Sequence, residues 1–184
     1  MANTVSNVTA GKPKISGAIF RADLPATMPT DATTALDAGF KLMGYISEDG
    51  VVNSNSPETS DIKAWGGDTV LNILESKEDT FQFTMLEVLN VDVLKAVYGS
   101  ANVTGALGTG ITVTANSKEA EGGAWAIDMV LRDGAVKRIA IPDAKISELG
   151  DISYTDSDAV GYEVTLTCMP DASGNTHYEY IIRS

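Results

Sequence analysis

The chain has 184 residues and carries 25 acidic and 13 basic side chains, so its formal net charge is -12. A surface this acidic is unsuited to holding nucleic acid through phosphate contacts, although it does not exclude a protein that must avoid holding nucleic acid. The single cysteine excludes an internal disulfide. No run approaches the roughly 20 apolar residues of a membrane span, and the polar N-terminus lacks the features of a secretory signal. The length predicts one domain, residues 1–184.

The first third of the chain alternates short β-like runs with polar connections. Residues 1–13 are small and polar and predict an N-terminal arm that is flexible in the isolated subunit. Residues 15–21 and 40–47 predict strands, and the connection between them contains two prolines that rule out a long regular element. Residues 48–68 begin with a turn signal and continue as a long polar loop. Loops of this length inside a compact domain are usually functional or disordered.

The polar and apolar residues of segment 80–85 alternate with the two-residue period of a half-buried strand. The polar set is Thr80, Gln82 and Thr84, and the apolar set is Phe81, Phe83 and Met85. The polar residues 76–79 predict a four-residue loop that pairs this strand with residues 70–76 as an antiparallel hairpin. Which face of residues 70–76 is buried stays open, because apolar side chains fall on both faces: Val70, Leu71, Ile73 and Leu74.

After Met85 the apolar spacing changes to three and four residues, which predicts a helix. Asn90 or Asp92 can serve its start and Gly99 its end. The residues predicted to pack this helix on the sheet are Leu89, Val93, Leu94 and Val97.

The second half of the chain consists of β-like runs separated by turn signals. Strands are expected at residues 111–115, 125–132, 135–141, 160–168 and 176–182. The pair Asp133 and Gly134 predicts a hairpin, Pro142 is expected to end the strand that follows, and residues 145–154 are either an edge strand or a loop. Seven to nine short strands and one helix predict an all-β fold, an antiparallel β-sandwich or half-barrel with one flanking α-helix.

A search for catalytic or metal-binding patterns finds none, so we expect no enzyme, no metal and no cofactor. His177 is the only histidine and lies in a strand pattern, and Cys168 closes a strand alternation in which a small buried residue is expected. The acidic residues 48, 49, 75, 78 and 79 are interpreted as turn and surface carboxylates. Residues 151–158 favour a solvated loop over a calcium site, because their spacing does not match the EF-hand. Trp65 either folds back on the core or anchors a partner.

Four blocks of the sequence together resemble a known family. They are NVTAGKPK with GAIFRADL, then PTDATTALDAGFK with GYISEDG, then NSNSPETSDIKAWGGDTVL, and finally EDTFQFTMLEVLNVDVLKAVYG. In composition and order these blocks are similar to the major tail tube proteins of long-tailed, siphovirus-type bacteriophages. The resemblance covers nearly the whole chain and is most specific over residues 29–99.

The resemblance implies a structural virion protein with the tail-tube-protein fold. Subunits would form stacked hexameric rings, and the resulting tube would admit the tape-measure protein and then transiently passing DNA, without specific nucleic-acid binding or a membrane. It also implies a virion location in the phage tail, with assembly in the bacterial host cytoplasm.

The resemblance further assigns regions of this chain to the lumen and to contacts between rings. Residues 48–68 would form a long inter-ring loop. Lumen-facing candidates are Asn72, Thr80, Gln82 and Thr84. Inter-subunit or inter-ring candidates are Glu48, Asp49, Val51, Asn53, Asn55, Pro57, Asp61 and Trp65. Closing edge strands against neighbouring copies would also remove the unpaired backbone of an open sheet.

The alternative function is a monomeric β-sandwich binding module for carbohydrate or adhesion. It would use the Trp65 loop, or the tyrosines Tyr162, Tyr178 and Tyr180, as a recognition face. Microscopy distinguishes the two hypotheses, because only the first predicts rings or tubes.

Overall fold

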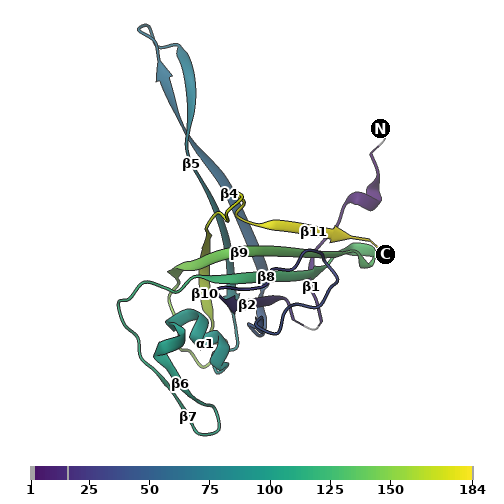
Figure 1. The fold of residues 1–184 in the computed structure, drawn as a ribbon, viewed down its shortest axis with the longest axis vertical. Helices are drawn as coiled ribbons and strands as arrows, with labels where there is room; N and C mark the ends of the chain where they lie inside the picture. Colours follow the sequence, from purple (N-terminus) through teal and green to yellow (C-terminus); the bar gives the residue numbers. More distant parts are fainter. Residues whose placement is uncertain (1–2, 16, 184) are drawn as a thin grey trace.

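The computed structural model of the chain describes residues 3–15 and 17–183 (Figure 1). Nine of the described strands form one antiparallel sheet: β1 (Lys12–Pro13), β2 (Ile19–Asp23), β3 (Lys41–Leu42), β4 (Ile46–Lys63), β5 (Thr69–Met85), β8 (Gly123–Val130), β9 (Val136–Leu149), β10 (Tyr162–Cys168) and β11 (Tyr178–Ile182). Strands β6 (Val103–Ala106) and β7 (Gly110–Val113) form a separate hairpin. Short 3₁₀ turns cover Val5–Asn7, Ser100–Asn102 and Arg132–Gly134, and α1 is Val91–Tyr98. The predicted all-β class with one helix is confirmed.

Strand β9 belongs to two half-sheets. The main strand order is β3-β2-β8-β9-β10-β5-β4, with β1 also on β8 and β11 also on β9. Residues Val136–Ala140 of β9 pair with β11, whereas residues 144–149 pair with β10. We call β4, β5, β10 and residues 144–149 of β9 the four-strand half-sheet. The other half-sheet consists of β1, β2, β3, β8, β11 and residues 136–141 of β9. In Figure 1, β4, β5 and β10 run lengthwise, while β8, β9 and β11 cross them.

The core lies where the two half-sheets and α1 face one another. Phe81 and Met85 of β5 are fully buried there, as are Val164 and Leu166 of β10 and Trp125 of β8. The ring of Trp125 meets that of Phe83 edge-on at 5.9 Å, and its Nε1 donates to the carbonyl of Ala144. Each large apolar side chain buried in this way contributes about 1.5–3 kcal/mol. The alternation of residues 80–85 therefore positions β5 against the core.

The flanking residues Asn90 and Gly99 set the two ends of helix α1. The side chain of Asn90 accepts a hydrogen bond from the backbone N–H of Asp92 at 3.0 Å, and Gly99 takes a φ of 92° at the other end. Val93 and Leu94 are buried and Val97 packs on the core. The prediction for Leu89 is wrong: it precedes the helix and is 63% exposed. Because the helix starts one residue after Asn90, the apolar period does not extend back to Leu89.

The segment predicted as the loop 48–68 is mostly strand. Strand β4 is 18 residues long and pairs with the 17 residues of β5, from Ile46 opposite Met85 to Lys63 opposite Thr69. The expected four-residue loop at residues 76–79 is also absent, because Ser76 and Glu78 pair with Glu58 and Ser56 within this ladder. Backbone hydrogen bonds between strands form whatever the side chains are, so a strand can be polar on both faces. Such a strand has no alternation of polar and apolar residues, and the sequence therefore does not reveal it.

Two further local predictions change in the structure, and a third is confirmed. The turn expected at Glu48 is an irregularity inside β4, since the pairing register shifts between Ile46 and Val51, with Gly50 at a φ of 72°. Pro142 does not end a strand: β9 continues through it to Leu149, and Pro142 lies where the partner strand changes. The hairpin predicted at Asp133 and Gly134 is confirmed by the antiparallel pairing of β8 with β9.

Candidate functional site: a polar sheet face and a projecting arm

One side of the four-strand half-sheet is mainly polar. Because Phe81, Phe83 and Met85 turn into the core, the alternating side chains of β5 turn to the opposite side. Pairing in register places the polar residues of β10 and β4 beside them. We call this surface the polar face; its central polar side chains are Ser54, Thr80, Gln82, Thr84, Glu163, Thr165 and Thr167. Val52 of β4 also lies on this face, opposite Gln82, and is 57% exposed.

Side chains of the polar face bond mainly to one another. Gln82 Nε2 donates to Glu163 Oε1 at 2.7 Å, and Thr167 Oγ1 donates to Ser147 Oγ at 2.8 Å. A shallow groove of about 270 Å³ follows β4 and β5 and is lined by serines and by carboxylates, including Glu78. Lys145 lies opposite Thr167 and is ion-paired with Glu119. The polar face is therefore neutral to acidic, which disfavours contact with another polyanion.

Both outer edges of the four-strand half-sheet are open within the described chain. β4 pairs with β5 on one side only. On β9, residues 145–149 pair with β10, and the ladder with β8 reaches no further than Ala144. An unpaired edge exposes a row of backbone N–H and C=O groups that can pair with another chain. The four-strand half-sheet thus carries two free edges, one on each side of the polar face.

Beyond the body, the β4–β5 hairpin projects as an arm, residues 57–77 (Figure 1). Leu71 and Ile73 share one arm face with Ile62, while Val70 and Leu74 lie on the other. All five are between 41% and 61% exposed. A two-stranded ribbon is marginally stable alone, and contiguous exposed apolar side chains mark interaction surfaces. The arm therefore has the composition of a segment that another molecule covers on both faces.

A buried carboxylate fixes the base of the arm. Asp79 is 2% exposed and accepts hydrogen bonds from Asn53 Nδ2 at 2.8 Å, from Thr176 Oγ1 at 2.5 Å and from His177 Nδ1 at 2.5 Å. Burial alone would raise the pKa of Asp79, but these three donors outweigh burial and lower it from its ordinary value. The ring of His177 also meets Phe81 edge-on at 5.4 Å. This Asp79 cluster ties β4 and β5 to the connection between β10 and β11.

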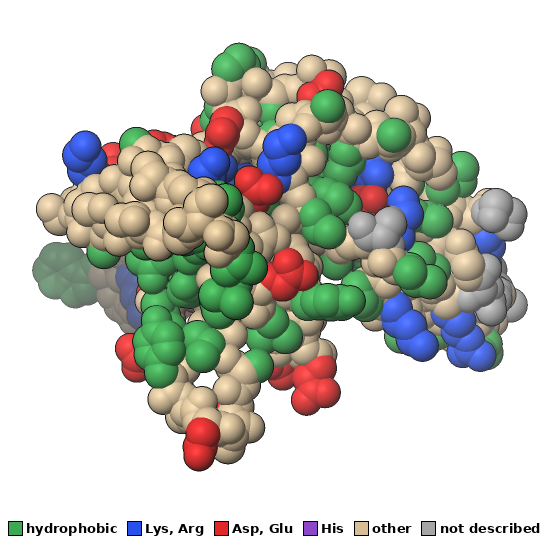
Figure 2. Space-filling model, turned by 90° about the horizontal axis from the view of Figure 1, so that it is seen from below, with side chains coloured by type: hydrophobic (Ala, Val, Ile, Leu, Met, Phe, Trp, Pro, Cys, Tyr) green, Lys and Arg blue, Asp and Glu red, His purple; other side chains and the backbone are tan. Residues whose placement is uncertain are grey.

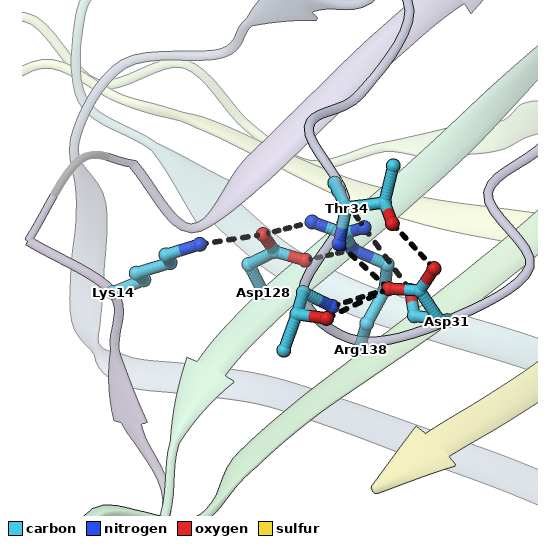
Figure 3. A network of polar contacts seen from close by, with 6 residues as sticks. Lys14, Asp31, Thr34, Asp128 and Arg138 are labelled. Atoms are coloured by element: carbon cyan, nitrogen blue, oxygen red, sulfur yellow. Dashed lines mark hydrogen bonds and ion pairs between the residues drawn. The ribbon is translucent and has the colours of Figure 1, made fainter. Parts of the chain in front are cut away.

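A second buried network lies on the other half-sheet (Figure 3). The guanidinium of Arg138 makes two hydrogen bonds to Asp128, at 2.6 and 2.8 Å, and two more to the carbonyls of Asp31 and Thr34. The Asp128 contact holds the pKa of Arg138 above its ordinary value. Lys14 Nζ lies 3.6 Å from Asp128. The network anchors the proline-containing connection between β2 and β3, so its role is to hold the fold.

The structure separates several residues that the sequence groups together. Of the four lumen candidates, Thr80, Gln82 and Thr84 lie on the polar face, whereas Asn72 lies on the arm and donates to Asp61. The inter-ring candidates are spread along the whole of β4 instead of forming one loop. Glu48 and Asp49 lie in its irregular start, Val51 packs on the core, Asn53 belongs to the Asp79 cluster, and Asn55, Pro57, Asp61 and Trp65 follow outward to the tip.

Sequence reasoning missed the Asp79 cluster. Asp79 was expected at the surface and His177 in an ordinary strand, and 98 residues separate them. The sequence offered one signal for Asp79. It lies where a run of polar residues meets the apolar alternation that starts at Phe81, so it stands at the edge of the buried part of the strand. The tyrosines of the alternative function do not form one face: Tyr162 is buried against Tyr98, while Tyr178 and Tyr180 stack on β11. Trp65 does not fold back on the core and is fully exposed.

Among the residues that the structure describes, no three His, Cys, Asp or Glu side chains come together as a possible metal site. No helix in this part of the chain is long and apolar enough to cross a membrane.

The polar face lies between two free strand edges, beside an arm that exposes apolar side chains. This arrangement is that of a structural subunit that assembles with other molecules. The chain belongs to the phage tail tube protein family, because the family model described as "Phage tail tube protein" matches residues 1–184, the whole chain. A comparison with curated protein sequences finds no match. Membership confirms the resemblance found in the sequence. It makes the protein a structural component of the virion tail that self-assembles into a tube.

Proposed function

We propose that copies of this chain join into a hexameric ring through the two free edges of the four-strand half-sheet. The outer edge of β4 in one copy pairs with residues 145–149 of β9 in the next, which leaves no open edge in the ring. Closed barrels enclose an aqueous channel once they reach about 16–18 strands, and four strands from each of six copies exceed that number. The observation that carries this proposal is that one polar face lies between both free edges.

In such a ring the polar face lines the bore. Its carboxylates, including Glu78, Glu148 and Glu163, repel phosphate, and its neutral polar side chains keep the wall wetted. DNA then passes without the counterion release that would hold it to a basic wall. The tape-measure protein occupies the same bore before the DNA, and the tube serves as the conduit for DNA ejection.

The arm and the N-terminal residues 1–13 bridge successive rings. Docking of the arm covers its two apolar faces, which removes exposed area that destabilises the isolated subunit. Rings therefore stack into a tube, in the host cytoplasm before incorporation into the virion. Exposed Trp65 at the arm tip provides a large contact area at small entropic cost.

The bore assignment is testable by labelling a cysteine placed on the polar face. In the variant Gln82→Cys, the new thiol lies on an exposed position, while native Cys168 is 6% exposed. Tubes grown from this variant are treated in parallel with N-ethylmaleimide and with a maleimide on a polyethylene glycol chain too large to enter the bore. Unassembled subunits treated in the same way are the control.

The expected result is that subunits react with both reagents, whereas tubes react only with N-ethylmaleimide, which diffuses along the bore. Reaction of tubes with the large reagent would place Gln82 on the outer surface. Reaction with neither would place it in a contact between copies. Either result refutes the assignment of the polar face to the bore.

A further inference from the structure

A hollow lined by cationic side chains lies at the end of the body away from the arm. It has a volume of about 200 Å³ and is bounded by β2, β3 and α1, with Arg21, Lys41 and Lys95 as its cations. Asp23 and Asp92 also line it. The hollow is therefore net positive in a chain whose formal net charge is -12. We call it the cationic pocket.

The three cations of the pocket differ in how far they are already engaged. The guanidinium of Arg21 is held by Asp23 at 2.6 Å and lies 5.9 Å from the centre of the Trp125 ring. Lys41 Nζ donates only to the carbonyl of Ala38, at 3.1 Å, and Lys95 makes no ion pair with any described side chain. Arg21 is thus a fixed part of the wall, while the two lysines can bind an incoming carboxylate.

The arm has the opposite charge. Residues 57–77 contain the carboxylates of Glu58, Asp61, Asp68 and Glu75 against two lysines. Glu58 and Asp61 accept hydrogen bonds from Ser76 and Asn72 on the arm itself. Asp68 lies in the turn at the tip, where its carbonyl accepts from the N–H of Ala64 at 2.8 Å and its side chain is exposed. The tip therefore presents one carboxylate beside the exposed indole of Trp65.

The arm and the pocket lie at opposite ends of the subunit. Figure 1 shows the arm rising from one end and α1 at the other, and Figure 2, seen from that other end, shows blue and red side chains interspersed across it. β5 extends about 30 Å from Asp79 to Thr69 at about 3.3 Å per residue, so the tip reaches well past the body. In a head-to-tail stack, each contact joins one end of a subunit to the opposite end of the next.

We propose that the cationic pocket receives the arm tip of a second copy of this chain in the adjacent ring. Asp68 of the arm pairs with Lys41 and Lys95, and Trp65 lies over a lysine side chain, an arrangement that attracts a cation to the ring face. The proposal rests on the proposed tube function and specifies the receptor for the arm. It also makes tube growth sensitive to salt, because these charges are only partly buried.

The test is a charge exchange between the pocket and the tip. The first variant carries Lys41→Glu and Lys95→Glu, the second carries Asp68→Lys, and the third combines all three changes. Lys118→Glu, which reverses an exposed lysine that does not line the pocket, is the matched control. Tube growth is measured as the critical concentration in a pelleting assay, with negative-stain microscopy to distinguish rings from tubes. Thermal melting of each variant shows whether the subunit is folded.

Each of the first two variants should raise the critical concentration for tube growth at least about tenfold, and microscopy should show rings without tubes. The critical concentration of the combined variant should lie within about threefold of the wild-type value. Normal tube growth by the Lys41→Glu and Lys95→Glu variant would overturn the docking and leave the tube function standing. Folded variants that the combination does not rescue would overturn the pairing of Asp68 with the lysines. Failure of the wild type to form rings or tubes would instead refute the proposed function.

Discussion

Replacing Asp79 by alanine removes the acceptor that holds the arm base to the connection between β10 and β11. The substitution leaves the side chains of Asn53, Thr176 and His177 without the partner they share. Asn53 keeps a second bond, to the carbonyl of Thr80 at 3.0 Å, and part of His177 can rehydrate because 16% of its side chain is exposed. The substitution therefore costs stability mainly through the two lost hydrogen bonds to Asp79 Oδ2, which link the arm base to Thr176 and His177.

The expected loss of folding free energy follows from those bonds. A hydrogen bond to a charged group contributes about 1.5–3 kcal/mol, but removing a buried carboxylate also recovers its desolvation cost. The balance for Asp79→Ala is a destabilisation of about 2–4 kcal/mol. For a chain of this length, a change of about 3 kcal/mol lowers Tm by roughly 6–12 °C. Thr176→Val removes one of these bonds to the carboxylate and should cost about 1.5–3 kcal/mol.

Urea denaturation of the unassembled subunit measures both losses, and hydrogen exchange locates them. Protection should fall in β11 and around residues 53–55 and 76–80 in the Asp79→Ala variant, and remain unchanged in β8. A destabilisation by Asp79→Ala below about 0.5 kcal/mol would refute the reasoning, since the three bonds less the recovered desolvation cost give about 2–4 kcal/mol. A larger cost for Thr176→Val than for Asp79→Ala would refute it as well.

Three further outcomes are expected. Because the folded-state pKa of Asp79 is lowered, its stabilisation is present above its ordinary value of 3.8 and is lost as pH falls through the folded value; the stability difference between wild type and Asp79→Asn, measured by urea titration, should therefore shrink as the pH is lowered below 3.8. Burial raises the pKa of the Cys168 thiol to about 12, so it should resist N-ethylmaleimide at pH 8 and react on unfolding in urea; rapid native labelling would contradict this. Arg138→Met leaves Asp128 buried without its main partner and should cost about 3–5 kcal/mol by calorimetry, against below 1 kcal/mol for the exposed Lys118→Met.

The parts of the fold that the sequence predicts are those with one buried face. Strand β10 alternates from Tyr162 to Cys168, and the structure buries every second residue along it. Helix α1 follows its apolar spacing and its Asn90 cap. In both cases the hydrophobic effect selects a period, and that period is visible in the residues themselves.

Strand β4 is invisible to the same reasoning because it buries almost nothing. Its residues Asn53–Lys63 are polar apart from Pro57 and Ile62, and they are held by backbone bonds to β5. Pro57 also argued for a loop, yet proline is tolerated on an edge strand, where one N–H faces away from the ladder. Edge position is a property of the assembled sheet, so no local pattern in the sequence reveals it.

The candidate site was predicted in part for the same reason. Thr80, Gln82 and Thr84 were identifiable because they alternate with buried residues. Asp79 and His177 were not, because their pairing depends on a contact between distant strands. The cationic pocket likewise joins residues from three elements, and Lys41 and Lys95 carry no local signal of being neighbours.

Strand β9 has a mechanical consequence for the tube wall. One continuous backbone passes from the layer of β8 and β11 into the four-strand half-sheet, and Trp125 Nε1 bonds to the carbonyl of Ala144 just beyond the crossing. In the proposed ring, a force on the four-strand half-sheet would therefore pass along this covalent backbone into the layer of β8 and β11. The bore wall of the proposed tube would then separate from the outer layer only if β9 itself unfolded, so both layers of each subunit would share the load.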